Sequence, residues 1–143
     1  MIEKITRAQT QPLRSVVLRN NKPPEECVLP TDENPDIFHL GYFEADKIIS
    51  IGTFFPEDYP DKGINGFRLR GMATDPNYAG KGYGAKLINF AINELKSKGA
   101  AYIWCNARAA AVGFYSRLEF EIISAEFDVP GIGPHFDMLY QIK

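Results

Sequence analysis

The sequence predicts an α/β fold in which helices cover both faces of a mixed β-sheet. Apolar, strand-like runs recur along the chain, and a helix with one clear apolar face lies between two of them, as in a strand–helix–strand crossover. The length of 143 residues, with 45% hydrophobic and 13% aromatic residues, predicts a single domain over residues 1–143, because this composition is ample for one core.

The N-terminal part is predicted to contain strands and one short helix. Alternating apolar and polar residues indicate a strand at its start, and Leu13, Val16 and Val17 share one side of the helix that follows. Two later apolar strands are separated by Glu44-Ala45-Asp46, a short polar connection that suits a hairpin. The expected elements are a strand at 2–7, a helix at 10–19, a loop at 20–35, and strands at 37–43 and 47–55.

The C-terminal part is predicted to contain the long amphipathic helix. Gly99 stops this helix, with Lys96 and Lys98 in its last turn, where the helix dipole favours positive charge. Its apolar residues have the spacing of one helix face and are Leu87, Ile88, Ala91, Ile92 and Leu95. The expected elements are a loop at 56–66, a strand at 67–74, helices at 84–98 and 109–118, and strands at 101–105, 120–129 and 135–142.

Charge and composition exclude several classes of function. A formal net charge of −2 and a pI near 5.7 argue against a nucleic-acid partner, which needs a basic face. No apolar run reaches the roughly 18 residues of a membrane span, so we expect no membrane partner and a soluble cytoplasmic protein. Cys27 and Cys105 lack metal-ligand spacing, so free thiols and no metal are expected. The sequence leaves open whether the chain forms a homodimer.

Three glycines, Gly80, Gly82 and Gly84, occupy alternate positions where the strand at 67–74 gives way to the long helix. At a helix N-terminus the first N–H groups have no intrahelical partner and the macrodipole is positive. A missing Cβ also lets a phosphate oxygen approach the backbone. The segment therefore predicts a site for an anionic ligand.

Three kinds of phosphate loop compete for this pattern. A P-loop is excluded, because Gly80-Lys81 is not followed by Ser or Thr. The dinucleotide fingerprint is met in relaxed form, but it needs an acidic residue roughly 20 positions further on, where this chain has Trp104-Cys105-Asn106-Ala107. The third interpretation is the pyrophosphate loop of a coenzyme A site.

With this loop and the segments around it, the chain resembles the GNAT superfamily of N-acetyltransferases. The similarity extends from residue 67 to about residue 120, and the hairpin at 128–135 is similar to that of small bacterial members. Its motifs are Leu69-Arg70-Gly71-Met72-Ala73-Thr74-Asp75-Pro76, the glycine loop, Asn106, Ala110, Phe114-Tyr115, Leu118 and Phe120. Two positions depart from the family pattern: Ala79 replaces the usual Gln or Arg, and Glu119 replaces the usual Gly.

The resemblance implies a largely antiparallel sheet with a splayed strand pair that forms the slot for acetyl-coenzyme A. In the family, the strand at 67–74 bulges and its free backbone groups pair with the pantetheine arm; Gly71 is well placed for the bulge. The N–H of Met72 or Ala73 would then stabilise the oxyanion. The residues expected at the cofactor are Met72, Ala73, Thr74, Ala79, Gly80, Lys81, Gly82, Tyr83, Gly84, Ala85, Asn106, Phe114 and Tyr115.

Tyr115 is the candidate catalytic acid. The departing coenzyme thiolate must take up a proton, and a positioned phenol can supply it. Phe114 and Leu118, four residues apart on the same helix, are expected to face the core. Arg117 either meets the 3′-phosphate of the coenzyme or is solvated, and the sequence does not decide between the two.

The catalytic base is less well defined by the sequence. An alkyl ammonium of pKa roughly 10.4 must lose a proton before it attacks. Candidates are His135, which follows a Gly-Pro turn, and Glu57 or Asp58 in the loop before the cofactor strand, directly or through water. His135 is preferred, because the pKa of an imidazole suits a general base at neutral pH. His39 lies inside an apolar run and is expected to be a core histidine with a backbone partner.

The predicted function is therefore transfer of an acetyl group from acetyl-coenzyme A to a primary amine by direct attack. The alternatives are a coenzyme A binding or sensing module without transfer, and a dinucleotide-binding oxidoreductase. Two acidic segments, 25–36 and 57–61, border the acceptor side in the family, which predicts a small, cationic amine. The alternative is that both loops are solvated and only aid solubility. The carboxylates concerned are Glu25, Glu26, Asp32, Glu33, Asp36, Glu57, Asp58 and Asp61.

Overall fold

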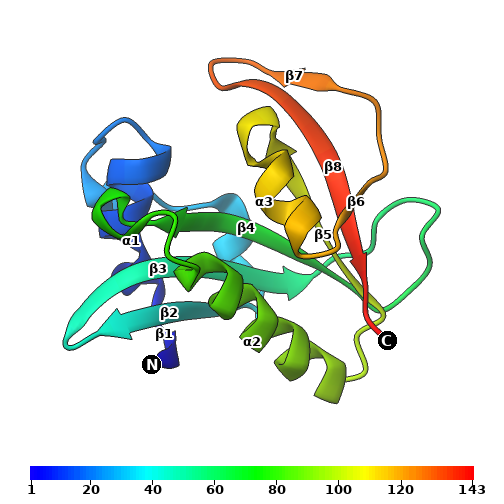
Figure 1. Cartoon of the computed structure of the whole chain (residues 1–143), viewed down its shortest axis with the longest axis horizontal. Helices are drawn as coiled ribbons and strands as arrows, with labels where there is room; N and C mark the ends of the chain where they lie inside the picture. Colours follow the sequence, from blue (N-terminus) through cyan, green and yellow to red (C-terminus); the bar gives the residue numbers. More distant parts are fainter.

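The computed structural model describes residues 1–143 and contains one eight-stranded sheet (Figure 1). The strand order is β1-β2-β3-β4-β5-β8-β6, with β7 paired to β8, and all pairs are antiparallel except β4 with β5. The strands are β1 (Ile2–Ile5), β2 (Phe38–Glu44), β3 (Lys47–Pro56), β4 (Gly66–Thr74), β5 (Tyr102–Arg108), β6 (Glu121–Ile122), β7 (Phe127–Val129) and β8 (Gly133–Gln141). The helices are α1 (Arg7–Leu13), α2 (Tyr83–Ser97) and α3 (Val112–Arg117). The short helical turns are η1 (Arg14–Leu18), η2 (Pro24–Glu26), η3 (Pro30–Glu33), η4 (Pro76–Tyr78) and η5 (Ala109–Ala111).

Helices cover both faces of the sheet, as predicted. In Figure 1, α2 crosses in front of the sheet and α1 lies behind it. The main core lies between the sheet, α2 and α3, and includes Leu69, Ile103 and Met138 together with the apolar face of α2. A smaller core on the other face joins Leu13 of α1 to Ile51 and Ala73. None of the helices is long and apolar enough to cross a membrane.

The parallel pair β4–β5 separates halfway along its length. Pairing runs from Gly66 opposite Tyr102 to Leu69 opposite Cys105 and then stops, although both strands continue. On its other side, β4 stays paired with β3, but two residues of β4, Gly71 and Met72, oppose the single residue Gly52 of β3, and Gly71 has φ +63°. This confirms the predicted bulge, which rotates the strand beyond Gly71 and leaves its β5-facing edge without a partner strand.

Several predicted elements differ from the structure. The first helix begins at Arg7 and not at residue 10, because Thr6 and Gln9 form a capping box at its N-terminus. Its continuation, η1, is a π-helix that follows Pro12, whose missing N–H removes one helical hydrogen bond. The segments 20–35 and 109–111, expected as loop and helix, contain 3₁₀ turns.

The predicted strand at 120–129 is wrong as one element, because it is broken into β6 and β7. Ser124 accounts for the break: its hydroxyl accepts the N–H of Asp137 at 2.9 Å, so a side chain replaces the backbone in the ladder. At the preceding helix end, Glu119 has φ +70°, the conformation that glycine adopts most easily. The Phe120 N–H still closes the cap on the Tyr115 carbonyl at 3.1 Å.

Candidate functional site

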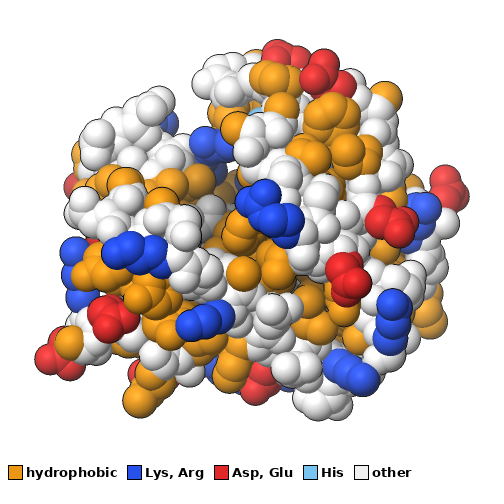
Figure 2. Space-filling view, in the orientation of Figure 1, with side chains coloured by type: hydrophobic (Ala, Val, Ile, Leu, Met, Phe, Trp, Pro, Cys, Tyr) orange, Lys and Arg blue, Asp and Glu red, His pale blue; other side chains and the backbone are white.

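A cavity of about 290 Å³ occupies the gap between β4 and β5. Its walls are the ends of these strands, η1, the loop before η3, α3 and the β7–β8 hairpin. Figure 2 shows the corresponding hollow between the N-terminal helices and the hairpin. Because the strands splay here, backbone groups and side chains from distant segments face the same space.

The β4 residues predicted at the cofactor lie along the unpaired part of the strand. Gly71 and Met72 line the cavity, whereas Ala73 is buried with 4% of its surface exposed. The Thr74 hydroxyl is 2.9 Å from the Ser50 hydroxyl, so it is held by β3. The strand therefore presents backbone, more than side chains, toward β5.

The glycine loop forms the N-terminus of α2, as predicted. Gly82 is the N-cap, with φ +85° and no side-chain cap, and the first helical hydrogen bond runs from the Lys86 N–H to its carbonyl at 3.1 Å. The N–H groups of Tyr83, Gly84 and Ala85 precede that bond and have no helical partner. They can therefore bind an anion.

The glycines of this loop serve different purposes. A Cβ on Gly80 or Gly82 would meet no atom within 4 Å, so both are needed for their positive φ. A Cβ on Gly84 would lie 3.0 Å from Met72 Cε and 3.3 Å from Phe114 Cζ. The missing Cβ of Gly84 therefore also lets α2 pack closely on β4 and α3.

The other loop residues predicted at the cofactor are on the surface. Ala79, Gly80 and Lys81 are exposed, and the Lys81 Nζ lies 5.9 Å from the ring centroid of Tyr78. Tyr83 is half-buried, and its hydroxyl donates to Glu44 Oε2 at 3.3 Å.

Tyr115 lines the cavity from α3. Its ring packs against Phe114 and Phe120, with centroid distances of 5.1 and 5.3 Å, and only 6% of the residue is exposed. Its hydroxyl makes no hydrogen bond within the protein. Burial raises the pKa of Tyr115 well above its ordinary value, so the phenol stays neutral. Phe114 and Leu118 pack against the main core, as expected, and both are partly buried.

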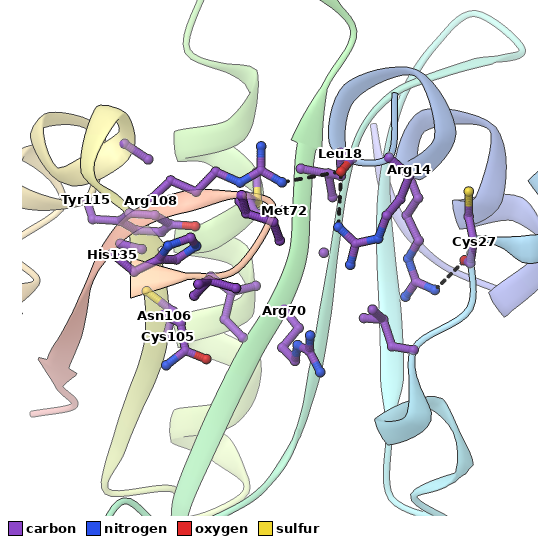
Figure 3. A pocket seen from close by; sticks show the side chains of 18 of the residues that line it. Arg14, Leu18, Cys27, Arg70, Met72, Cys105, Asn106, Arg108, Tyr115 and His135 are labelled. Atoms are coloured by element: carbon purple, nitrogen blue, oxygen red, sulfur yellow. Dashed lines mark hydrogen bonds between the residues drawn. The ribbon is translucent and has the colours of Figure 1, made fainter. Parts of the chain in front are cut away.

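His135 lines the same cavity from β8. The residue is 6% exposed, and its ring stacks on Phe127 at a centroid distance of 5.8 Å. Nδ1 lies 2.9 Å from the Gly133 carbonyl oxygen, which can only accept a hydrogen bond. In the neutral ring Nδ1 therefore carries the proton, and Nε2 keeps a lone pair. Figure 3 shows the ring among the side chains that line the cavity.

The other candidate bases lie outside the cavity. Glu57 pairs with Arg68 at 3.2 Å, and Asp58 accepts the Gly66 N–H at 2.8 Å. Both lie at the closed end of the β4–β5 pair, where the two strands remain hydrogen-bonded. His39 is buried, as predicted, but its Nδ1 partner is the Thr53 hydroxyl at 2.7 Å and not a backbone group.

Asn106 lines the cavity at the point where the strands separate. Its carbonyl oxygen accepts a hydrogen bond from Arg68, and its amide donates to Asp137 Oδ1. Tyr59 donates to the other Asp137 oxygen at 2.6 Å, and this bond raises the pKa of Tyr59 to about 12. This network was not predicted from the sequence, although Asp137 in an otherwise apolar strand was a signal for it.

Four arginines on the cavity wall were also missed. They are Arg14, Arg19, Arg70 and Arg108, and no Asp or Glu lines the cavity. The carboxylates that suggested a cationic acceptor do not line this wall; Asp32 is buried against Arg14, and Glu57 is paired with Arg68. The charge facing the cavity is therefore opposite to the expected one. For Arg14, Arg19 and Arg70, the signal in the sequence was an arginine inside a predicted helix or strand.

Comparison with known proteins agrees with the fold. The model of the acetyltransferase (GNAT) family matches residues 4–120. The chain is 36% identical to the uncharacterized N-acetyltransferase YitI of Bacillus subtilis (strain 168), over 99% of this chain and 96% of that protein.

Two solved structures share the fold. An aminoglycoside 6′-N-acetyltransferase complexed with coenzyme A has a TM-score of 0.77 and 16% identity, with coverage of 100% of this chain and 97% of that one. The ribosomal-protein-S18-alanine N-acetyltransferase from Escherichia coli has a TM-score of 0.77 and 17% identity, with coverage of 99% and 93%.

Proposed function

The chain belongs to the acetyltransferase (GNAT) family, and from this premise we propose that it transfers an acetyl group to a primary amine by direct attack on the thioester. It is an acetyl-coenzyme A dependent N-acetyltransferase, which excludes the dinucleotide-binding oxidoreductase considered above. The observation that carries the proposal is the gap between β4 and β5, where Tyr115 and His135 line one cavity beside an unpaired strand edge.

The residues present fit acetyl-coenzyme A along two surfaces. The free edge of β4 from Gly71 to Thr74 offers backbone groups to the amides of the pantetheine arm, as a neighbouring strand would. The unpartnered N–H groups at the start of α2, with Gly80 and Gly82 before them, would hold the pyrophosphate. When bound, the coenzyme supplies the activated acetyl group. Beside the bulge, Met72 or Ala73 would donate an N–H to its carbonyl oxygen.

Tyr115 acts in this proposal as the proton donor. Its hydroxyl faces the cavity without a protein partner, so it is available to a group bound there. The raised pKa keeps the proton on the phenol until a thiolate develops close to it. Tyr115 then protonates the thiolate as the thioester bond breaks, which stabilises the departing group.

His135 acts as the proton acceptor for the incoming amine. The hydrogen bond from Nδ1 to Gly133 fixes the tautomer in which Nε2 has a lone pair. Nε2 takes the proton from the ammonium form directly or through one water, so that the amine becomes nucleophilic.

Direct attack fits better than a covalent enzyme intermediate. Cys105 and Cys27 are the thiols at the cavity, and both are buried. Burial raises the pKa of the Cys105 thiol, so it would rarely form the reactive thiolate. The Cys27 sulfur points at the Lys22 and Pro23 carbonyl oxygens, at 3.8 and 3.6 Å.

Two-substrate kinetics test this proposal. Thiol release from acetyl-coenzyme A is measured over a broad panel of amines, with both substrates varied. Direct attack gives intersecting double-reciprocal lines, whereas an acetyl-enzyme gives parallel lines and acetyl-coenzyme A consumption in a burst without amine. Tight binding of coenzyme A without thiol release for any amine would favour the binding or sensing module.

A further inference from the structure

We propose that the acceptor is an amine that also carries an oxyanion, a carboxylate or a phosphate, and that Arg70, Arg19 and Arg108 bind this anion in the cavity. The inference rests on the proposed amine transfer and names its acceptor class. It replaces the cationic acceptor that the sequence suggested.

The uncompensated charge of the cavity wall is positive. Of the four arginines that line it, Arg14 is neutralised by Asp32, with Nη1–Oδ2 and Nη2–Oδ1 distances of 2.8 and 3.2 Å. Arg19, Arg70 and Arg108 form no ion pair with a carboxylate.

Arg70 is the least satisfied of these groups. It is half-buried on β4 and makes no side-chain hydrogen bond, although Asp32, Asn106 and Glu57 are bonded to other arginines nearby. The pKa of Arg70 is lowered, first by burial and then by the charges of Arg68, Arg19 and Arg14. The charge of Asp32 acts against this shift but is the smallest of these effects. A guanidinium still carries its charge at neutral pH under such a shift. A charge that is half-buried and surrounded by like charges favours an anion from outside.

Arg19 and Arg108 meet from opposite walls of the cavity. Arg19 Nη1 and Arg108 Nη2 both donate to the Leu18 carbonyl oxygen, at 3.1 and 3.4 Å (Figure 3). Two cations thus share one neutral acceptor, and the longer bond is weak. A carboxylate or phosphate offers several charged oxygens to these donors, and such bonds are roughly twice as strong as neutral ones.

The placement agrees with the chemistry proposed for the same cavity. Arg70 is on β4, next to the bulge at Gly71, while Tyr115 and His135 line the wall formed by α3 and β8. An acceptor held at its anionic end by the arginines would extend its amine toward these two residues. The cavity volume of about 290 Å³ suits an acceptor of amino-acid size.

The exposed acidic loops do not alter this conclusion. Glu25, Glu26 and Asp36 are exposed and lie outside the cavity lining. At physiological ionic strength, charges separated by more than about 8 Å of solvent are largely screened. The arginines act at contact distance inside the cavity and therefore determine which acceptor binds.

Matched acceptor pairs test the proposal. Glycine is compared with glycinamide, and aminoethyl phosphate with ethanolamine, as thiol release from acetyl-coenzyme A. We expect the anionic member of at least one pair to have the higher kcat/KM, and the preferred pair identifies the oxyanion. The glycine pair is a stringent test, because the amide has the less basic amine and so more of the reactive form.

Substitution of Arg70 connects this preference to the arginines. Arg70→Gln should reduce the preference for the anionic member by roughly 10–100-fold, through the KM of the acceptor and with the KM of acetyl-coenzyme A unchanged. Arg7→Gln is the matched control, because Arg7 is exposed and outside the cavity. An increase confined to the KM of acetyl-coenzyme A would assign the arginines to the coenzyme phosphates and overturn the proposal.

A binding readout separates this inference from the proposed function. With coenzyme A present, glycine or aminoethyl phosphate should raise the melting temperature of the wild type, its neutral partner should not, and Arg70→Gln should remove the difference. Absence of thiol release with this pattern intact would contradict amine transfer only. Equal transfer to neutral and anionic amines would contradict only the acceptor class, and equal stabilisation by both members of each pair would do the same.

Discussion

Asp32 and Arg14 form a buried ion pair that fastens the segment before β2 to η1. The Nη1–Oδ2 distance is 2.8 Å, and the side chains are 0% and 2% exposed. Asp32 also accepts the Leu29 N–H at 2.8 Å, while Arg14 donates to the Thr53 hydroxyl and to the Cys27 carbonyl oxygen. Because Arg14 lines the cavity, the same pair shapes one wall of the site.

Asp32→Asn should lower the free energy of unfolding by about 3–5 kcal/mol, because it leaves a buried guanidinium without its counter-charge. Urea denaturation checks this value. Glu33→Gln is the matched control, since Glu33 pairs with Arg7 at 3.6 Å on the surface and should hardly affect stability. A small effect of both substitutions would show that Arg14 finds water or another partner.

The same pair predicts loss of stability in acid. Burial raises the pKa of Asp32, but hydrogen bonds from Arg14 and Leu29 and the charge of Arg14 leave it below its ordinary value of 3.8. The folded form therefore binds the proton less readily than the unfolded form. The contribution of this pair to stability is complete at pH values above the ordinary pKa of 3.8, and it is lost as the pH falls through the lower pKa of the folded state. In denaturation series from pH 6 to pH 2, Asp32→Asn should show the shallower decline.

Tyr115→Phe should lower kcat by roughly 10²–10⁴-fold with little change in the KM of acetyl-coenzyme A, because the ring remains and only the proton donor is removed. Steady-state kinetics at saturating acceptor measure this. Tyr140→Phe is the control, since Tyr140 packs against Phe120 outside the cavity. Wild-type turnover in the Tyr115 variant would mean that water protonates the thiolate.

His135→Gln should lower kcat/KM for the acceptor by roughly 10²-fold at neutral pH, as expected for a general base. The loss should shrink as the pH approaches the amine pKa of roughly 10.4, where the substrate no longer needs a base. His39→Gln is the control, because His39 is buried outside the cavity. A loss of the same size at every pH would indicate a structural role for His135.

Gly82→Val should weaken coenzyme A binding in a folded protein. At φ +85° a branched side chain is strained, and it would also stand over the N–H groups at the start of α2. Gly99→Val is the control: φ is +82°, its surroundings are equally empty, and it follows the other end of α2. Calorimetric titration of both variants should show weaker binding for Gly82 alone; equal affinities would move the pyrophosphate site away from this loop.

Much of the fold could be predicted because its signals are local. The spacing of apolar residues in α2, the glycine that ends it and the polar connection between β2 and β3 act over a few residues. The failures also have local causes that a pattern does not reveal. The capping box at Thr6 extended the first helix, and a hydroxyl bond from Ser124 to the Asp137 backbone broke the strand expected at 120–129.

The candidate site was predictable where it coincides with a contiguous motif. The glycine loop, Gly71 and Tyr115 were identified in this way, and their placement at one end of β4 agrees with the sequence. In the structure, two of the three candidate bases, Glu57 and Asp58, lie at the opposite end of β4. No pattern within the sequence distinguishes the closed end of a parallel pair from its open end.

The sequence by itself determined the family, the order of the main elements and the loop at the start of α2. The tertiary structure alone decided the charge of the cavity. Arg19, Arg70 and Arg108 come from three separate segments, and they line one cavity only because β4 and β5 part after Leu69 and Cys105. The carboxylates of the loops do not line the cavity: Asp32 and Glu57 are paired with arginines, and others, such as Glu25, are exposed outside it. Side-chain electrostatics depend on which groups lie within a few ångströms of each other, and the packing of distant segments sets those distances.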